Sequence, residues 1–124
     1  MLLRTGDFEA SRNELNRALE LDGNSAGAQH GLGLIDLQEG KFDQAVADFR
    51  RAIAMRPAYL DAERSLARAL ALQHKWYEAA ALLRHVTAAN TNSSEDDSAL
   101  GTALSNLGNR AGAAEEFARA RTFE

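Results

Sequence analysis

The sequence repeats itself with a period of 34 residues, and this repetition limits the folds open to the chain. Shifting the chain by one period aligns glycine, aromatic, alanine and large apolar positions without a gap. Gly40 recurs as Gly6 and Gly108, with His74 at the same position in another copy. The other matched sets are Phe8, Phe42, Trp76 and Arg110; Ser11, Ala45, Ala79 and Ala113; Leu15, Phe49, Leu83 and Phe117; Ala18, Ala52, Val86 and Ala120; Leu32, Leu66 and Leu100; and Gly33, Ala67 and Gly101. So many agreeing positions indicate an array of structural repeats.

Apolar residues within each copy have helical spacing. Ala45, Phe49 and Ala52 follow one another at i, i+4 and i+7, which places them on one stripe of a helix. Short breaks at 39–42, 73–76 and 107–110 divide each copy, and the glycines there suit helix C-caps. Longer breaks at 22–27, 56–59 and 90–97 separate the copies. In the last of these, Ser94 and Asp97 predict a capping box that opens a helix. Each copy is therefore predicted to be a helix–turn–helix.

The pattern resembles the tetratricopeptide repeat family. The clearest copy reads Leu32-Gly33…Gly40…Phe42…Ala45…Phe49…Ala52…Pro57, and the resemblance covers essentially the whole chain. It implies an all-α fold, a right-handed superhelical solenoid of antiparallel helix pairs in which the first helix of each pair lines a concave surface. Gly23, His74, Thr91 and Arg110 depart from the family pattern, which puts local loop geometry in question.

The register divides the chain into about three and a half repeats. We expect one domain made of a partial first repeat (1–25), two full repeats (26–59 and 60–93) and a fourth that is truncated at its end (94–124). Because solenoids normally need polar capping helices, we expect either a fragment of a longer array or self-association through the uncapped ends.

Composition excludes several classes of protein. The formal charge of −4 argues against nucleic-acid binding, and no apolar run reaches the length of a membrane span. The chain has no cysteine, so disulfides and thiolate metal sites are excluded. The opening residues lack a signal-peptide layout, which favours the cytoplasm, or the periplasm if a signal was removed. Helices rich in alanine and arginine indicate a bacterial source.

No catalytic or cofactor motif is visible. Gly31 and Gly33 are followed by Asp36 where a dinucleotide loop needs its third glycine, and no phosphate-binding P-loop occurs. The histidines His30, His74 and His85 lie on separate segments without zinc-ligand spacing. The carboxylate pairs Asp96–Asp97 and Glu115–Glu116 are interpreted as solvated faces or as charge at helix N-termini. We therefore predict no enzyme activity, no cofactor and no metal site.

The resemblance implies where a partner binds, on the first helices of the repeats. The expected groove residues are His30, Leu34, Leu37, Arg64, Arg68, Ala71, Ser98, Thr102 and Ser105. Arg64 and Arg68 are four residues apart, so both guanidinium groups can reach one carboxylate or phosphate. Alternatively, one of them pairs with Asp61, Glu63 or an acidic residue of a neighbouring repeat. The groove is graded from apolar through basic to small and polar, which suits a peptide with an apolar anchor and an acidic residue. Reversing both arginine charges is expected to weaken binding without loss of helicity.

Part of the family binds the C-terminal carboxylate of chaperone peptides through a clamp of Lys, Asn, Asn, Lys and Arg. The corresponding residues are His30, Leu34, Ser65, Glu95 and Ala99, so the clamp is absent and a chaperone co-factor is disfavoured. We predict a protein–protein interaction module. Two alternatives stay open: a regulatory or substrate-presenting array of a larger enzyme such as a glycosyl- or sulfotransferase, or an envelope, secretion or pilus assembly factor.

Overall fold

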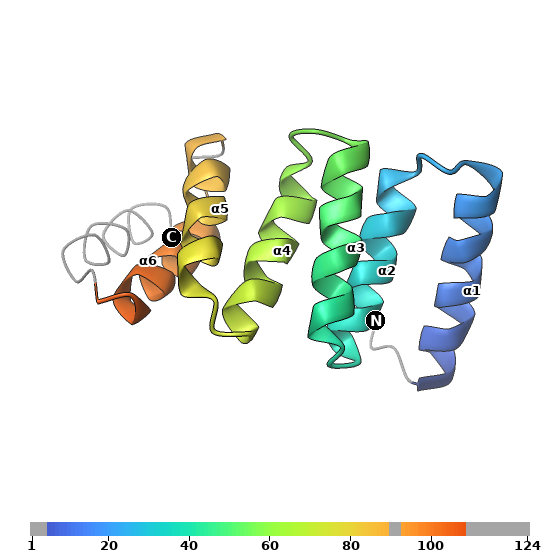
Figure 1. The fold of residues 1–124 in the computed structure, drawn as a ribbon, viewed down its shortest axis with the longest axis horizontal. Helices are drawn as coiled ribbons and strands as arrows, with labels where there is room; N and C mark the ends of the chain where they lie inside the picture. Colours follow the sequence, from blue (N-terminus) through green and yellow to red (C-terminus); the bar gives the residue numbers. More distant parts are fainter. Residues whose placement is uncertain (1–4, 90–92, 109–124) are drawn as a thin grey trace. The chain divides into compact units, whose positions relative to one another are not determined.

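The computed structural model describes residues 5–89 and 93–108, which form six α-helices and no β-strand (Figure 1). The chain makes two compact units, Met1–Ala62 and Glu63–Glu124. Successive first helices begin at Ala26, Leu60 and Ser94, one 34-residue period apart. The counterparts at Thr91 and Arg110, and the Glu115–Glu116 pair, lie outside the described residues.

The first unit is built around α2. It contains α1 (Thr5–Leu21), α2 (Ala26–Gln38) and α3 (Phe42–Met55), and α2 contacts both of the other helices. Gly33 of α2 lies against the Phe49 ring of α3, since a Cβ added at Gly33 would stand 2.5 Å from Phe49 Cε1. Phe49 has no solvent exposure. The predicted role of Gly33, a small residue where the two helices of a pair approach closely, is confirmed.

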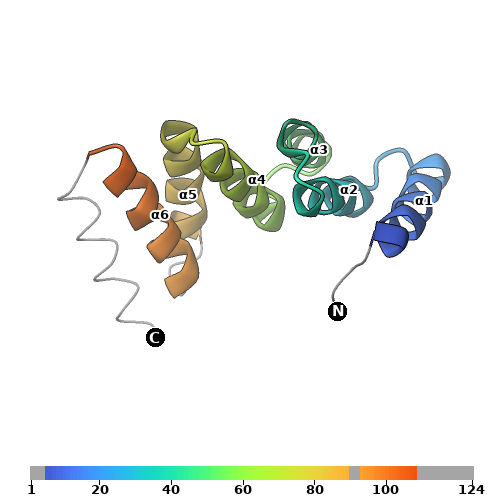
Figure 2. The ribbon, with the colours of Figure 1, turned by 90° about the horizontal axis from the view of Figure 1, so that it is seen from below.

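The second unit is held together by an apolar cluster from three helices. They are α4 (Leu60–Leu72), whose first turn precedes the unit boundary, α5 (Trp76–Ala89) and α6 (Ser94–Asn106); Figure 2 shows α5 beside α6. Ala67 of α4, Ala80 and Leu83 of α5, and Leu100, Ala103 and Leu104 of α6 form the buried cluster. Ala67 and Leu83 occupy the repeat positions that Gly33 and Phe49 occupy in the first unit. In the second unit the first helix thus has the larger residue, alanine in place of glycine, and the second helix has the smaller one, leucine in place of phenylalanine.

The turns that end the first helices share one backbone geometry. Gly40, His74 and Gly108 all have positive φ, at 79°, 63° and 83°. In two of these turns the amide that follows reaches back to the same point in the helix: Lys41 N donates to Asp36 O and Lys75 N to Leu70 O, both at 2.8 Å. These bonds are those of the left-handed C-cap. The departure at His74 therefore leaves the loop unchanged, and a histidine adopts a conformation that favours glycine.

Serine side chains cap the N-termini of two of the first helices. Ser25 Oγ accepts a hydrogen bond from the Ala28 amide, and Ser93 Oγ accepts one from the Asp96 amide at 3.2 Å. The prediction of Ser94 as the N-cap is wrong by one residue, because two adjacent serines followed by three acidic residues leave the register of the cap undefined in sequence. The first turn of α6 is acidic as expected, but two of its three acidic residues are not solvated. Asp96 and Asp97 are 2% and 0% exposed.

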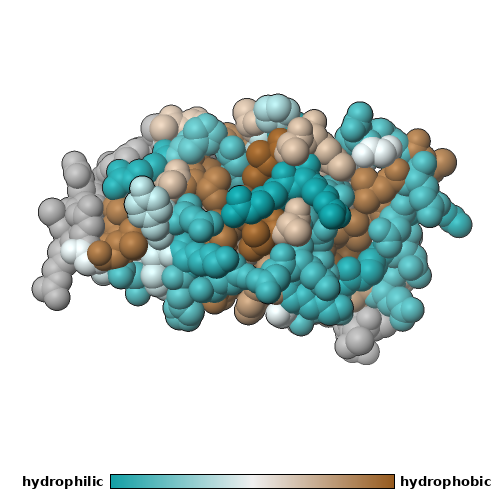
Figure 3. Space-filling model, in the orientation of Figure 1, coloured by the Kyte–Doolittle hydropathy of each residue, from teal (hydrophilic) through white to brown (hydrophobic). Residues whose placement is uncertain are grey.

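Polar and charged side chains cover much of the face shown in Figure 3, with hydrophobic patches between the ridges. The helices of the described residues are all too short or too polar to cross a membrane.

Candidate functional site

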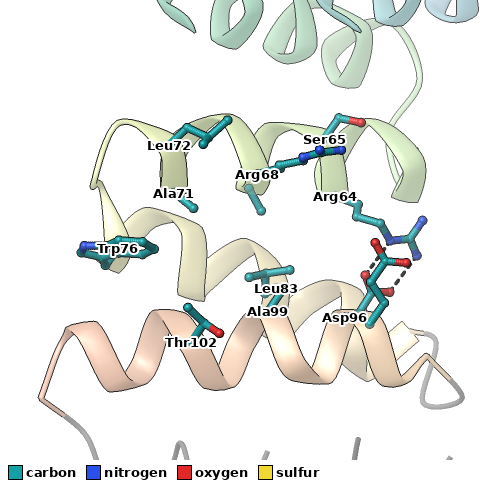
Figure 4. Close-up of a pocket in the computed structure, with 12 residues that line it drawn as sticks. Arg64, Ser65, Arg68, Ala71, Leu72, Trp76, Leu83, Asp96, Ala99 and Thr102 are labelled. Carbon is teal, nitrogen blue, oxygen red and sulfur yellow. Dashed lines mark hydrogen bonds and ion pairs between the residues drawn. The ribbon is translucent and has the colours of Figure 1, made fainter. Parts of the chain in front are cut away.

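A cavity of about 510 Å³ lies in the second unit between the two first helices, α4 and α6, with α5 as its floor (Figure 4). We call it the α4–α6 groove. It is lined by Arg64, Ser65, Ala67, Arg68, Ala71 and Leu72 of α4, by Trp76 and Leu83 of α5, and by Glu95, Asp96, Ala99 and Thr102 of α6.

A two-point ion pair closes one end of the groove. Arg64 Nε donates to Asp96 Oδ1 at 2.6 Å, and Arg64 Nη2 donates to Asp96 Oδ2 at 2.8 Å. The Asp96 side chain is 2% exposed and that of Arg64 is 32% exposed. Parallel guanidinium–carboxylate bonds fix both groups strongly. The alternative in which one arginine pairs with an acid of a neighbouring repeat is thus what the structure shows for Arg64.

Arg68 keeps its charge available to a ligand. Its side chain is exposed, and it forms no ion pair or hydrogen bond within residues 5–89 and 93–108. Glu95, on the opposite wall, is also exposed and also lacks a charged partner in that part of the chain. In Figure 4, Arg68 lies between the ion pair at one end and Trp76 at the other.

The far end of the groove is apolar. Figure 4 places Trp76, Ala71 and Leu72 together at the end of α4, opposite the Arg64–Asp96 pair. Trp76 is partly buried, and its ring makes an edge-on contact with the His74 ring at 5.7 Å between centroids. Leu72 is 48% exposed. An apolar side chain of a partner could bury surface here.

Four of the nine predicted groove residues line this cavity: Arg64, Arg68, Ala71 and Thr102. Ser98 and Ser105 lie on α6 but do not line it, and the Ser98 carbonyl accepts a hydrogen bond from Thr102 Oγ1 at 3.0 Å. Trp76 and Leu83 also line the groove, but in the sequence they were matched repeat positions and were not among the expected groove residues. The repeat register could have indicated Trp76, because Trp76 begins the second helix, α5, which forms the floor of the groove.

The three predicted residues on α2 belong to the first unit. The His30 ring packs against Phe49 and Tyr59, with the Tyr59 hydroxyl 3.4 Å from His30 Nδ1. Burial lowers the pKa of His30, while the negative charge of Asp61 opposes this shift. Leu34 is 38% exposed and lines a separate cavity of about 360 Å³ between α1 and α2, and Leu37 is partly buried.

Gly31, interpreted from sequence as keeping the groove open beside His30, instead faces α1. A Cβ added at Gly31 would stand 3.0 Å from Leu15 Cδ1. Gly31 and Leu15 line the same α1–α2 cavity. The glycine therefore allows α1 to approach α2.

A polar cleft of about 370 Å³ in the first unit contains two carboxyl groups. Buried Asp36 pairs with Arg12 at 2.9 Å, and Arg12 also pairs with Glu39. Asp48 accepts a hydrogen bond from Gln29 Nε2 at 2.8 Å. Burial, a hydrogen bond to Asp36 and repulsion from its charge raise the pKa of Asp48 to about 7. Two carboxyl groups joined by a hydrogen bond, such as those of Asp48 and Asp36, favour a proton held between them.

The remaining polar clusters do not resemble a metal centre. Among the described residues, no group of three or more His, Asp or Glu side chains is placed to hold a metal ion. His85 is exposed and lies 2.9 Å from Glu63, with Nδ1 facing Oε2. His74 is exposed at its turn.

Comparison with known proteins agrees on one fold. The sequence model described as tetratricopeptide repeat matches residues 36–104. No curated protein matches the sequence. A crystal structure of MamA is 19% identical, with a TM-score of 0.88, and the match covers 96% of this chain and 70% of that one. MamA 41-end from Desulfovibrio magneticus RS-1 is also 19% identical, with a TM-score of 0.91 and coverage of 96% and 67%.

YrrB, a tetratricopeptide repeat protein with an unusual peptide-binding site, is 24% identical, with a TM-score of 0.87 and coverage of 96% of this chain and 61% of that one. This chain therefore spans about two thirds of the length of the structures that it matches. At these identities the likeness concerns the fold, and it confirms the predicted all-α fold class of repeated helix pairs.

Proposed function

The chain belongs to the tetratricopeptide repeat family, and we propose that it is a protein–protein interaction module that binds a peptide or protein segment in the α4–α6 groove. The groove combines an apolar end at Trp76 with the exposed cation of Arg68. The peptide-binding site of YrrB, a protein of the same fold, supports a peptide as the class of ligand.

The observation that carries this proposal is the exposed guanidinium of Arg68 beside a partly open apolar surface. An arginine with free donors recognises a carboxylate by two parallel hydrogen bonds. Burying an apolar side chain against Trp76 and Leu72 supplies affinity, because aromatic anchors in pockets dominate the energetics of interfaces. The expected ligand therefore has an acidic residue and an apolar anchor.

The other candidate functions have no specific support. Neither the array of a larger enzyme nor an envelope, secretion or pilus assembly factor is favoured by an observation among residues 5–89 and 93–108. We propose no catalytic role, since the one buried carboxylate that lines the groove is held by Arg64.

A peptide library displayed on phage tests the proposal. Immobilised protein should enrich peptides that contain an acidic and an apolar residue. Arg68→Glu should weaken the binding of an enriched peptide about tenfold by calorimetry, a change of ~1.4 kcal/mol. Arg84→Glu is the matched control, because Arg84 is an exposed arginine on α5 that does not line the groove. The proposal fails if no peptide is enriched, or if both variants bind equally well.

The single variant is preferable to the double reversal of Arg64 and Arg68. In Arg64→Glu a second carboxylate would face the buried Asp96, with no cation to compensate it. Breaking a buried pair in this way is strongly destabilising, on the order of 3 kcal/mol or more. Loss of binding in that double variant would therefore report unfolding as well as lost recognition.

A further inference from the structure

Resting on the proposed function, we propose that the α4–α6 groove selects an extended segment in which an apolar, an acidic and a basic side chain alternate in that order. The apolar side chain packs on Trp76, the acidic one meets Arg68, and the basic one meets Glu95. The inference adds a second charge to the ligand and assigns Glu95 as a residue that determines specificity.

The charges of the groove cancel in one place and remain in two others. Four charged side chains line it, two of each sign. Arg64 and Asp96 neutralise each other through their two-point ion pair. Arg68 and Glu95 are both exposed and do not pair with each other. Because a complementary partner places opposite charge against each group, this pattern fits a segment carrying both an acid and a base.

The order of these groups follows from their places on the helices. Arg68 is one turn before Leu72 and one turn after Arg64, so about 6 Å of α4 separates each step. Glu95 immediately precedes Asp96, which holds Arg64, and it therefore belongs to the ion-pair end of the groove. Figure 4 shows Trp76, then Arg68, then the Arg64–Asp96 pair along the groove, and Glu95 adjoins Asp96 in the chain, so the order is Trp76, Arg68, Glu95.

An extended segment matches these steps. In a β-like chain, alternate side chains face the same side and stand about 6.6 Å apart. Residues i, i+2 and i+4 of such a segment would thus meet the three groups in turn.

Glu95 also has a structural role to separate from recognition. It lies in the first turn of α6, where a negative charge interacts favourably with the helix dipole. That role affects the stability of α6 in every variant at Glu95, whatever the peptide. Recognition, in contrast, predicts that the preferred charge on the peptide reverses when the charge at position 95 reverses.

A charge-swap selection tests the inference. A library of random 12-residue peptides displayed on phage is selected on wild type, Arg68→Glu and Glu95→Lys. Arg84→Glu and Glu20→Lys are the controls, since both residues are exposed and outside the groove. Unfolding midpoints confirm that each variant is folded. Wild type should enrich the alternating apolar, acidic and basic pattern, in either chain direction.

Each of the two groove variants should reverse the charge preferred at one position of the enriched pattern. Arg68→Glu should convert the acidic position to a basic one, and Glu95→Lys should convert the basic position to an acidic one. Each variant should bind the wild-type peptide about five- to tenfold more weakly and recover affinity with the peptide of reversed charge. The controls should leave the pattern unchanged.

Two results overturn the inference while the proposed function stands. One is enrichment of acidic and apolar residues with no basic position that responds to Glu95→Lys. The other is spacing of i, i+3 and i+4, which would indicate a helical ligand. If no peptide is enriched on the wild type or on any of the variants, the proposed function itself is refuted.

Discussion

Adding one methyl group at Gly33 tests how closely α2 and α3 are packed. The Cβ of alanine would stand 2.5 Å from Phe49 Cε1 and 2.6 Å from Cδ1, whereas carbon atoms in contact are normally about 3.5–4.0 Å apart. The Phe49 ring has no solvent-exposed surface, so it has no open direction in which to move. The helices must separate by about 1 Å, or the ring must leave its rotamer.

The size of the effect follows from two opposing terms. Overpacking a buried contact costs about 1–3 kcal/mol. Replacing glycine by alanine inside a helix stabilises it by about 0.5–1 kcal/mol. Gly33→Ala should therefore lower the free energy of unfolding by about 1–2 kcal/mol. Gly27→Ala, in the same helix but with no atom within 4 Å of the added Cβ, should raise it by about 0.5–1 kcal/mol.

A third variant isolates the contact. In the second unit Ala67 faces the buried cluster that contains Leu83, so alanine and leucine occupy the two repeat positions together. Phe49→Leu should accordingly make room for alanine at Gly33, with a coupling free energy of about 1–3 kcal/mol between the two changes.

The assay is urea unfolding, followed by far-ultraviolet circular dichroism, of the wild type, the three single variants and the double variant Gly33→Ala/Phe49→Leu. The reasoning is refuted if Gly33→Ala stabilises the protein as much as Gly27→Ala does. It is also refuted if Gly33→Ala has the same effect with leucine at position 49 as with phenylalanine.

Three further changes test local features. Folding raises the pKa of Asp48 to about 7, so the folded chain keeps a proton that the unfolded chain releases near pH 4. The free energy of unfolding should therefore fall as pH rises from about 4 through about 7. Because Asp48 is partly exposed, we expect a fall of about 1 kcal/mol. Asp48→Asn, which can still accept from Gln29, should abolish that loss in urea titrations at several pH values; an unchanged profile would contradict the assignment. His74→Gly should raise the thermal midpoint, with a gain of up to about 1 kcal/mol, because it relieves a left-handed backbone; a lower midpoint would argue against strain there. Ser93→Ala should cost about 1 kcal/mol in chemical unfolding, and Ser94→Ala clearly less; equal losses would contradict the cap.

The repeat register made much of the fold predictable. The left-handed turns at Gly40 and Gly108 and the tight contact at Gly33 follow from residue size at fixed positions. These features can be predicted without knowing which distant residues pair, because every copy of the repeat provides the same local evidence. The family resemblance implied that Arg68 and Thr102 face a groove, and both residues line the α4–α6 groove.

Pairwise interactions between distant residues were not predictable in this way. The burial of Asp96 depends on Arg64, 32 residues earlier, and nothing in the local acidic run distinguishes it from a solvated helix start. The carboxyl pair of Asp36 and Asp48 likewise joins two helices, and neither residue is part of the repeat pattern. The N-cap differed from its prediction because Ser93 and Ser94 offer equivalent hydroxyls to the same turn.

The ion pair between Arg64 and Asp96 has a consequence for how this array can evolve. It joins the first helices of successive repeats, so neither residue can be replaced alone without leaving a charge near the core. Duplicating, deleting or exchanging one of these two repeats would separate the partners. Inheritance should therefore keep α4 and α6 together as a block, and related arrays should either retain both residues or have lost both.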